Sequence, residues 1–520
     1  MKYTCHQLFI KTPHRQYIKF FLLCLLCLAY LFGLLVDIQG DAAKYAAIGR
    51  VLVEGGDWLA IQERFGGAYL QKPPFLFWLV GSSFSLFGIS NFSFKLFPFL
   101  FTLLGGYFTY CFAHSFYSKT IARLSLLIFF TVEATFIYSN DVRTDTVLMP
   151  LVIASIWQLL LFCKNNSSKH ILYGSVALAF ALLTKGPLAI ALVLIAMATH
   201  IVLKKNWIVI LRWQWLLIFI IPSAMLLPYL YTLYHQFGLD GIIFFFWKNN
   251  VGRITGSYLK NYSDPFFYVH NLLWVFFPWS FFFLIAYVRQ CIALYKTRFF
   301  ITKHPKSKAV FTTISEGGSI GVLTIFLLIL SIASFKSPNY LYVLTPFVSL
   351  MTAISLVDIY NTGNIFGWKV SRSSCKAFIS IVVLFMALLN MFLSLWVFPY
   401  VFRHHRYRQA SKIIAESKYS HLPLYVYHDK QSLVSPTLKF YLDKQVIHIS
   451  SLDQLNTLEG SWLLIAKEDF QQIEGLDVKA KVKHTHELIH YKTKNSLPIA
   501  LFFTDNDKKK LEKYFLVALW

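Results

Sequence analysis

The chain has 520 residues, of which 56% are hydrophobic, 18% aromatic and only 14% charged, and its formal net charge is +24. A soluble globular protein carries about 25% charged residues, so this composition excludes an ordinary soluble domain and favours a polytopic membrane protein. The positive charge does not indicate nucleic-acid binding, because most Lys and Arg residues stand in short clusters between apolar runs, as in the cytoplasmic loops of membrane proteins.

The first apolar run extends from Phe20 to Val36 and follows Lys11, Arg15 and Lys19. It lacks the small-residue cleavage site of a signal peptide, and many more apolar runs follow it. We therefore predict a retained first helix with a cytoplasmic N-terminus.

The next apolar run, from Phe75 to Gly88, directly follows Pro73 and Pro74. As a helix it would reach about 21 Å, whereas the hydrocarbon core of a bilayer is about 30 Å thick. We predict that the two prolines start a helix that lies along the outer membrane surface. The segment 95–114 then makes the next crossing.

The remaining apolar runs predict a bundle of membrane-spanning helices. They lie near 121–139, 146–163, 170–184, 187–203, 213–234, 266–288, 318–334, 340–358 and 377–398. The sum is about eleven crossings, or twelve to thirteen if short runs are counted. We predict an all-α polytopic membrane domain over residues 1–399, with outer-face loops at 37–94 and 235–265.

The composition changes after Tyr400. Strand-like "LPLYVYH", "QVIHIS" and "SWLLIAK" alternate with helix-like "SPTLKFYLD" and "SLDQLNTL". This alternation predicts a small α/β domain over residues 400–520. An odd number of crossings places it outside the cytoplasm, in the periplasm of a Gram-negative cell.

Acidic residues gather in the predicted outer loops. Asp41 begins an amphipathic stretch, and Asp141 and Asp145 stand in "YSNDVRTDTVLMP". Acidic residues beside an apolar span are costly and often functional. Asp41 and Asp145 could instead only cap the helices that follow them.

Cations share these loops, namely Lys72, Lys185, Lys248, Arg253 and Lys336. A phosphate group needs Lys or Arg partners, and an acceptor needs a general base, so acids and cations together suit an anionic lipid headgroup. Each lysine could also be an interface anchor whose ammonium reaches water.

Several blocks follow one another in a recognisable order: "DAAKYAAIGRVLVEGGDWL", "YLQKPPFLFWLVGSSFSLFG", "NDVRTDTVLMP", "LLTKGPLAI", "FFFWKNNVGRI", "FPWS" and "SFKSPNYLYVLTP". They resemble the lipid-phosphosugar-dependent glycosyltransferases of the C-type membrane (GT-C) fold. That superfamily includes protein O-mannosyltransferases and the aminoarabinose transferase that modifies lipid A. The resemblance covers nearly the whole chain, and "LKFYLDKQVIHISS" is similar to the external domain of the aminoarabinose-transferase branch.

The resemblance implies roles for individual residues. Lys72, in the KPP motif, would contact the phosphate of the polyprenyl-phosphate donor, and Asp41 would be the catalytic carboxylate. Together with the placement of the other charges, it leads us to predict catalytic roles for Asp41, Asp145 and Asp141. We predict donor-phosphate binding by Lys72, Lys44, Arg253 and Lys185.

The chain also departs from the family pattern. Ala42 follows Asp41 where the family commonly has Glu, and Gln71 precedes the KPP lysine where the aminoarabinose transferases have Glu. Asn249 and Asn250 replace a Glu-His pair that the same branch uses at a metal site. We expect no cofactor and no metal ligands, with a divalent metal as the alternative.

The resulting hypothesis is an integral protein of the bacterial inner membrane that transfers a sugar from a polyprenyl-phosphate (undecaprenyl-phosphate) donor. The acceptor would be lipid A or another envelope glycolipid, with a protein hydroxyl as a further option. The expected partners are this donor, the acceptor and membrane lipids, without nucleic acid. The alternatives are a transporter or flippase of lipid-linked sugars, and an inactive scaffold of the same fold.

Overall fold

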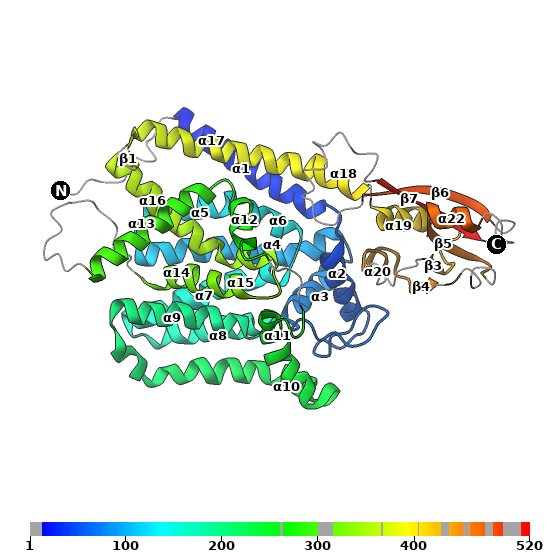
Figure 1. Cartoon of the computed structure of the whole chain (residues 1–520), viewed down its shortest axis with the longest axis horizontal. Helices are drawn as coiled ribbons and strands as arrows, with labels where there is room; N and C mark the ends of the chain where they lie inside the picture. The colour runs from blue at the N-terminus through cyan, green and yellow to red at the C-terminus, as the bar shows by residue number, and fades with distance from the viewer. Residues whose placement is uncertain are drawn as a thin grey trace.

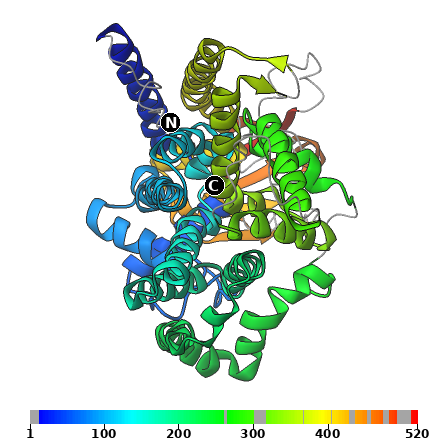
Figure 2. The same ribbon diagram turned by 90° about the vertical axis from the view of Figure 1, so that its left-hand side faces the viewer.

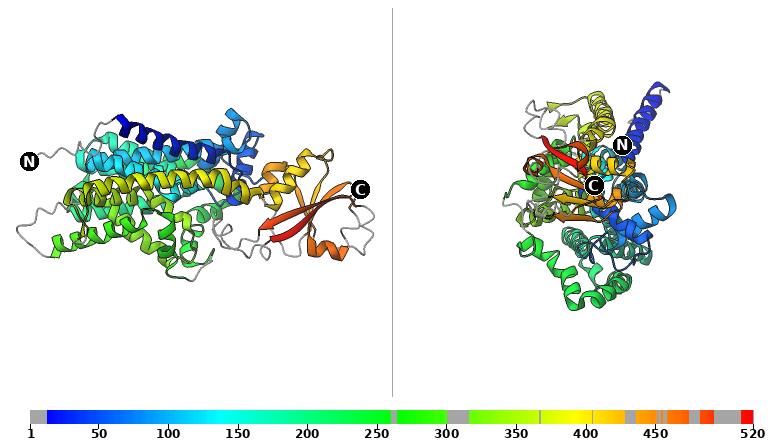
Figure 3. Two further views of the ribbon diagram at one scale, coloured as in Figure 1. Left: turned by 90° about the horizontal axis from the view of Figure 1, so that it is seen from above. Right: turned by 90° about the vertical axis from the view of Figure 1, so that its right-hand side faces the viewer.

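The computed structural model of the chain describes residues 13–259, 264–299, 316–365, 368–403, 405–427, 436–449, 451, 454, 458–473, 482–491 and 511–519. Figure 1 shows two parts in line, a bundle of long helices and a smaller part with a β-sheet. The view from above in Figure 3 (left) shows the sheet beyond the same end of the bundle. The short helices α2 and α3 lie at the junction.

The helical part contains, in chain order, α1 (Pro13–Leu35), α2 (Gly40–Val53), α3 (Phe75–Phe87), α4 (Asn91–Phe116), α5 (Lys119–Thr131), α6 (Glu133–Asn140), α7 (Thr144–Asn165), α8 (Ser168–Lys185), α9 (Leu188–Lys204), α10 (Leu217–Ile243), α11 (Val251–Thr255), α12 (Phe267–Val275), α13 (Ser280–Phe299), α14 (Gly318–Gly321), α15 (Leu327–Ile332), η6 (Pro338–Leu344), α16 (Thr345–Thr362), α17 (Arg372–Phe392), η7 (Leu393–Val397) and α18 (Phe398–Arg403).

The centre of the bundle is formed by α7 and α16, which are buried along almost their whole length. A helix that is apolar on all sides is typical of such a position. By contrast, α1 lies at the periphery in the view along the bundle (Figure 2) and exposes apolar side chains such as Phe20 and Leu31. This pattern suits a bundle whose outer helices face lipid.

The described residues contain five helices that are long and apolar enough to cross a membrane, or up to eight if each of three bent helix pairs is one span. The count of about eleven crossings stays a prediction. Two predicted spans are not straight. The segment 121–139 is split into α5 and α6, which are bent by 52°, and 266–288 into α12 and α13, bent by 118°.

The two breaks contact each other, and this contact gives their physical reason. Pro278 has no backbone N–H and interrupts the second segment. The carbonyl of Phe277 accepts a hydrogen bond from the backbone N–H of Glu133, at the start of α6, at 2.9 Å. The predicted outer loop 235–265 also differs from the structure, because α10 continues to Ile243 and α11 follows.

Helices α2 and α3 pack tightly against each other at the end of the bundle. A Cβ atom on Gly49 of α2 would lie 2.3 Å from Cγ1 of Val80 on α3, so only glycine permits this approach. As predicted, α3 starts directly after Pro73 and Pro74, and it has 13 residues. That length corresponds to about 20 Å, too short to cross a bilayer.

The smaller part is built on a five-stranded sheet with the order β4-β3-β5-β7-β6. Its elements are α19 (Arg406–Glu416), β3 (Leu424–Tyr427), α20 (Pro436–Leu442), β4 (Val446–Ile449), β5 (Ser461–Ala466), α22 (Lys467–Ile473), β6 (Val482–Tyr491) and β7 (Leu511–Leu519). Strand β3 is parallel to β4 and β5, whereas β7 is antiparallel to β5 and β6. The predicted α/β fold class is confirmed. The domain boundary at 399/400 stays a prediction, since α18 runs across it.

Candidate functional site

The predicted outer loops place three charged side chains in a row at the start of α2. Arg143 Nε donates a hydrogen bond to Oδ2 of Asp141 at 3.0 Å, and the same guanidinium pairs with Asp41. Burial lowers the pKa of Arg143, but Asp141 and Asp41 raise it by more, so it lies above its ordinary value. Arg143 therefore stays charged and holds two of the predicted catalytic carboxylates on one cation.

Asp41 is the more accessible of these acids. Its side chain is 55% exposed, and it lies in the first turn of α2, whose N-cap residue Gln39 makes no side-chain cap. A carboxylate at a helix N-terminus is stabilised by the helix dipole. Asp41 is therefore open to an approaching group while one of its oxygens is held by Arg143.

Asp145 is in a different environment, since it is buried and forms an ion pair with Lys185 at 2.5 Å. Its second oxygen accepts a hydrogen bond from Asn339 Nδ2 at 3.2 Å. A buried charge needs such partners to offset its desolvation. Both Asp145 oxygens are thus occupied, and the carboxylate is well placed to orient Lys185.

Tyr340 connects Lys185 with Arg253. The Lys185 ammonium lies 4.3 Å from the centre of the Tyr340 ring, and Arg253 donates to the Tyr340 hydroxyl at 3.2 Å. Arg253 also donates to Asn249 Oδ1 at 3.1 Å. Asn249 in turn donates to the backbone carbonyl of Gln71 at 2.8 Å, beside Lys72.

Lys72 is the cation at the centre of this arrangement. It is partly buried, and it has no hydrogen bond or ion pair among the residues that the structure describes. Burial, and after it the nearby charges of Lys185 and Arg253, lower the pKa of its ammonium to about 7, and the opposite charges of Asp145 and Asp41 offset this only in part. A bound anion would relieve both effects.

Lys44 is engaged elsewhere. Its ammonium pairs with Glu63 at 2.7 Å and lies 4.7 Å from the centre of the Tyr69 ring. The structure thus gives Lys44 a carboxylate partner of its own within the first loop. Its predicted phosphate contact stays a prediction.

Two lysines of the predicted outer loops, Lys336 and Lys248, have no assigned role and differ from Lys72. Lys336 is buried, and its ammonium donates to the carbonyls of Asp264 and Ser331 at 2.8 and 2.9 Å. Lys248 is exposed and makes a long ion pair of 3.8 Å with Asp240. Lys336 therefore ties together two chain segments, and Lys248 serves as a reference for an exposed loop lysine.

A metal ion does not fit the residues at the positions where the resemblance would place it. Asn250 Nδ2 donates to the carbonyl of Phe245 at 2.9 Å. The Asn249 amide accepts from Arg253 and donates to the carbonyl of Gln71. Within the described ranges, no group of three or more His, Cys, Asp or Glu side chains is close enough to hold a metal.

Sequence reasoning missed four residues of this site, namely Glu63, Arg143, Asn339 and Tyr340. The sequence contains a signal for Arg143, because this residue stands between two acidic residues in "NDVRTD". Asn339 and Tyr340 lie in the block "SFKSPNYLYVLTP". Their hydrogen-bond partners, Asp145 and Arg253, are more than 80 positions away along the chain. Only the fold brings them together.

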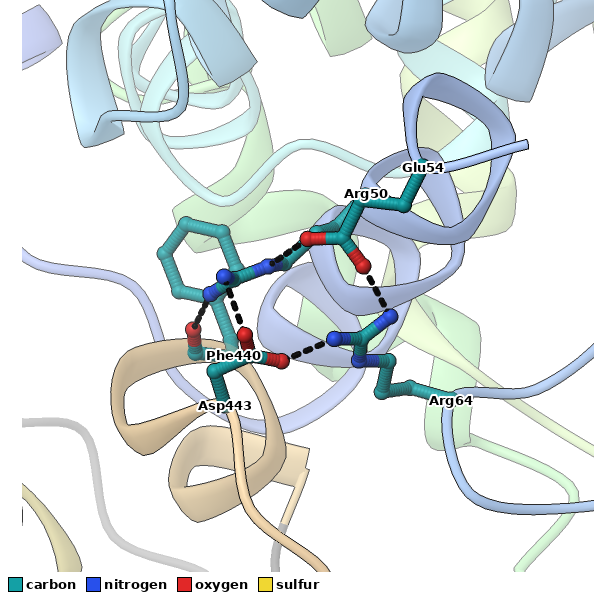
Figure 4. A network of polar contacts seen from close by, with 5 residues as sticks. All are labelled: Arg50, Glu54, Arg64, Phe440 and Asp443. Atoms are coloured by element: carbon teal, nitrogen blue, oxygen red, sulfur yellow. Dashed lines mark hydrogen bonds and ion pairs between the residues drawn. The ribbon is translucent and has the colours of Figure 1, made fainter. Parts of the chain in front are cut away.

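The sheet part contacts α2 and the loop that follows it through a ring of four charged side chains, shown in Figure 4. Arg50 and Arg64 each pair with both Glu54 and Asp443. Arg50 also donates to the carbonyl of Phe440, on α20, at 3.3 Å. This ring fixes α20 against α2, the helix that carries Asp41.

The structure superposes on the crystal structure of ArnT from Cupriavidus metallidurans bound to undecaprenyl phosphate, with a TM-score of 0.70, 14% identity, and coverage of 96% of this chain and 98% of that one. The chain has the GT-C fold. An archaeal oligosaccharyltransferase from Archaeoglobus fulgidus matches with a TM-score of 0.51 and 12% identity, covering 83% of this chain and 64% of that one.

Sequence comparisons agree with the GT-C fold. Residues 71–231 match the family model described as dolichyl-phosphate-mannose-protein mannosyltransferase. An undecaprenyl phosphate-alpha-4-amino-4-deoxy-L-arabinose arabinosyl transferase of Shewanella sediminis is 27% identical over 252 residues, which are 46% of this chain and 44% of that protein. The protein of the same name from Enterobacter sp. (strain 638) is 24% identical over 352 residues, 64% of this chain. The chain spans about half the length of these relatives, at 44% and 58%.

Proposed function

We propose that the chain is a glycosyltransferase of the bacterial inner membrane. It takes a sugar from a polyprenyl-phosphate carrier and transfers it to an acceptor at the outer membrane face, with lipid A as the favoured acceptor. The observation that supports this proposal best is Lys72, a partly buried cation without a partner among the described residues and next to two further cations. Such a cluster suits a phosphate group.

The donor phosphate would lie at Lys72, with Lys185 and Arg253 beside it. As the bond between the sugar and the phosphate breaks, negative charge develops on the phosphate oxygens. Positive charges that are already in place stabilise this charge more than water can, because they need not reorganise. Tyr340 contributes by holding Lys185 over its ring and Arg253 at its hydroxyl.

Asp41 would act on the acceptor. One of its oxygens is held by Arg143, and its side chain remains half exposed. An acceptor hydroxyl would donate its proton to Asp41 as it attacks the sugar, which is general base catalysis. A lipid A phosphate is already ionised, and Asp41 would then orient it through a shared proton or water. Direct displacement inverts the anomeric carbon.

The relatives support this assignment by their chemistry. The arabinosyl transferases named above use an undecaprenyl-phosphate-linked aminoarabinose, and the crystal structure of similar fold holds undecaprenyl phosphate. The family model that matches residues 71–231 is named for a dolichyl-phosphate mannose donor. Lipid-linked phosphate is common to all three.

The first test measures binding of undecaprenyl phosphate to the protein in lipid nanodiscs. For Lys72→Ala we expect the Kd to rise about tenfold or more, from the loss of a charge-assisted contact. Lys248→Ala, which removes an exposed lysine of the outer loops, is the control and should leave the Kd unchanged. Equal Kd values for all three proteins would contradict the phosphate assignment.

The second test identifies the acceptor. Mass spectrometry of lipid A and of envelope proteins from cells with and without the gene should reveal a mass increase of one sugar that depends on the gene. The Kd of Lys72→Ala could rise as expected while no envelope fraction shows a mass increase of one sugar that depends on the gene. This result would contradict the transferase activity, and the protein would then be only a binder of lipid phosphate.

A further inference from the structure

A cavity of about 590 Å³ opens between the ends of α1 and α18 and the side of α19. Leu35, Val36 and Pro399 form its apolar wall, and Arg408, Lys412 and Glu416 of α19 form its polar wall. The volume is in the range of small-molecule sites, about 300–1,000 Å³.

The apolar wall belongs to the face that a membrane would cover. Leu35 is 63% exposed, and two aromatic residues near the cavity, Trp396 and Tyr400, are 70% and 40% exposed. Exposed Trp and Tyr at the ends of apolar helices are typical of the membrane–water interface. The cavity therefore lies at the depth of lipid headgroups, with its apolar side toward the acyl chains.

The charges of the polar wall are balanced. Arg408 Nε donates to Oδ2 of Asp37, which also lines the cavity, at 2.9 Å. Lys412 and Glu416 are exposed and lack an ion pair or hydrogen bond within the described parts of the chain. They are four positions apart on α19, so their side chains start about 5–6 Å from each other on one helix face.

We propose that this cavity binds the headgroup of a phosphoethanolamine lipid. The lipid phosphate would contact Lys412 and its ammonium would contact Glu416, while its acyl chains would follow α1 and α17. The two charges of this headgroup are separated by a two-carbon spacer, which matches one cation and one carboxylate a helical turn apart. An anionic headgroup fits less well, because Glu416 would face a negative charge without compensation.

Such a lipid would fasten α19 to the membrane surface. Because α19 packs on α20 and on β6, and α20 contacts α2, the bound headgroup would hold the sheet part close to α2, the helix that carries Asp41. The inference does not depend on the proposed transfer reaction, and its test does not use activity.

The test is native mass spectrometry of the protein released from nanodiscs that contain equal amounts of phosphatidylethanolamine and phosphatidylglycerol with identical acyl chains. The variants are Lys412→Ala and Glu416→Ala. Lys418→Ala is the control, because Lys418 is an exposed lysine just beyond α19 that does not line the cavity. All these residues are on the surface, so the unfolding temperature in lipid-free detergent should be the same for all proteins.

We expect the wild-type protein and Lys418→Ala to retain one phosphatidylethanolamine in preference to phosphatidylglycerol. Each cavity variant should retain it about threefold to tenfold less, as expected for one charge-assisted contact near the surface. Preference of the wild type for phosphatidylglycerol, or increased lipid retention by Glu416→Ala, would overturn the proposal in favour of an anionic headgroup. Equal retention by all four proteins would overturn it in favour of bulk lipid.

Discussion

Two lysines of the first loop have the same charge and different surroundings. Lys44 faces Glu63 at 2.7 Å, whereas Lys72 faces Lys185 and Arg253. A paired ammonium is stabilised in the empty protein, but an unpaired one beside like charges is stabilised mainly when an anion binds. At the scale of single residues, donor recognition should therefore depend on Lys72 more than on Lys44.

The lowered pKa of Lys72, about 7, predicts a pH dependence of donor binding. Only the protonated amine attracts phosphate, and its fraction falls from about 0.9 at pH 6 to about 0.1 at pH 8. The affinity for a sugar-linked undecaprenyl phosphate, a diester that does not titrate in this range, should thus fall by up to about tenfold over these two pH units. Binding isotherms at several pH values measure it.

Lys72→Arg is the matched control for this experiment, because a guanidinium stays protonated throughout the range. Its Kd should be nearly constant between pH 6 and pH 8. A flat profile for the wild-type protein as well would mean that Lys72 is fully protonated in the empty site.

Asp41→Asn separates the acceptor side from the donor side. The amide keeps the shape of the carboxylate but removes its charge and its basicity. We expect turnover to fall by about a hundredfold or more, while the donor Kd stays near the wild-type value. Single-turnover transfer and donor titration on the same preparation provide both numbers. Normal turnover would show that Asp41 has no catalytic role and only occupies the N-terminal turn of α2.

How much of the site the sequence predicts depends on the range of each interaction. The KPP motif predicts the role of Lys72, and its two prolines predict the start of α3, because both features depend only on neighbouring residues. The partners of Asp145 are 40 and 194 positions away along the chain, so no local pattern reveals that this acid is already paired. Its catalytic role stays a prediction.

At the scale of elements, α2 is held on two sides. One side packs closely on α3 at Gly49, and the other is tied to α20 by the ring of Arg50, Glu54, Arg64 and Asp443. The loop between α2 and α3 contains Arg64 and Glu63 and leads to Lys72. The ring thus links the sheet part to positions 50, 54 and 64 of the segment that connects Asp41 with Lys72.

A double-mutant cycle on Asp443→Ala and Arg64→Ala tests this link. The ring is partly buried, with 16% and 34% of the Arg64 and Asp443 side chains exposed, so we expect a coupling energy of about 0.5–3 kcal/mol in unfolding. Hydrogen exchange of the backbone between residues 54 and 74 should increase in each single variant. Strict additivity, with unchanged exchange, would show that the two residues act independently.

The same scale also shows where sequence patterns are insufficient. Apolar runs predicted a helix at every span, but they did not predict the bends between α5 and α6 or between α12 and α13. Hydrophobicity shows which residues avoid water, but it says little about the direction in which a helix axis runs. The bends depend on Pro278 and on a hydrogen bond between segments 144 positions apart, from Glu133 to Phe277.

At the scale of the whole molecule, the predicted orientation can be tested with reporter fusions. A periplasm-dependent reporter fused after residue 400 should be active, because the sheet part must share a face with the loop that it contacts at Asp443. A cytoplasm-dependent reporter inserted at Lys303, a position outside the described residues, should also be active. Cytoplasmic activity of the first fusion would contradict both the odd number of crossings and the shared outer face.

The ring around Asp443 also has a consequence for biosynthesis. Arg50 and its partner Asp443 are separated by 393 positions along the chain, and at about 5–20 residues per second the ribosome needs roughly 20–80 s to make the intervening segment. During that interval the loop with Asp41 and Lys72 is already synthesised while its outer support is missing. The segment with Asp41 and Lys72 is therefore among the first made and the last to be completed, so we expect a nascent or truncated chain to lack the proposed activity until the C-terminal part has docked.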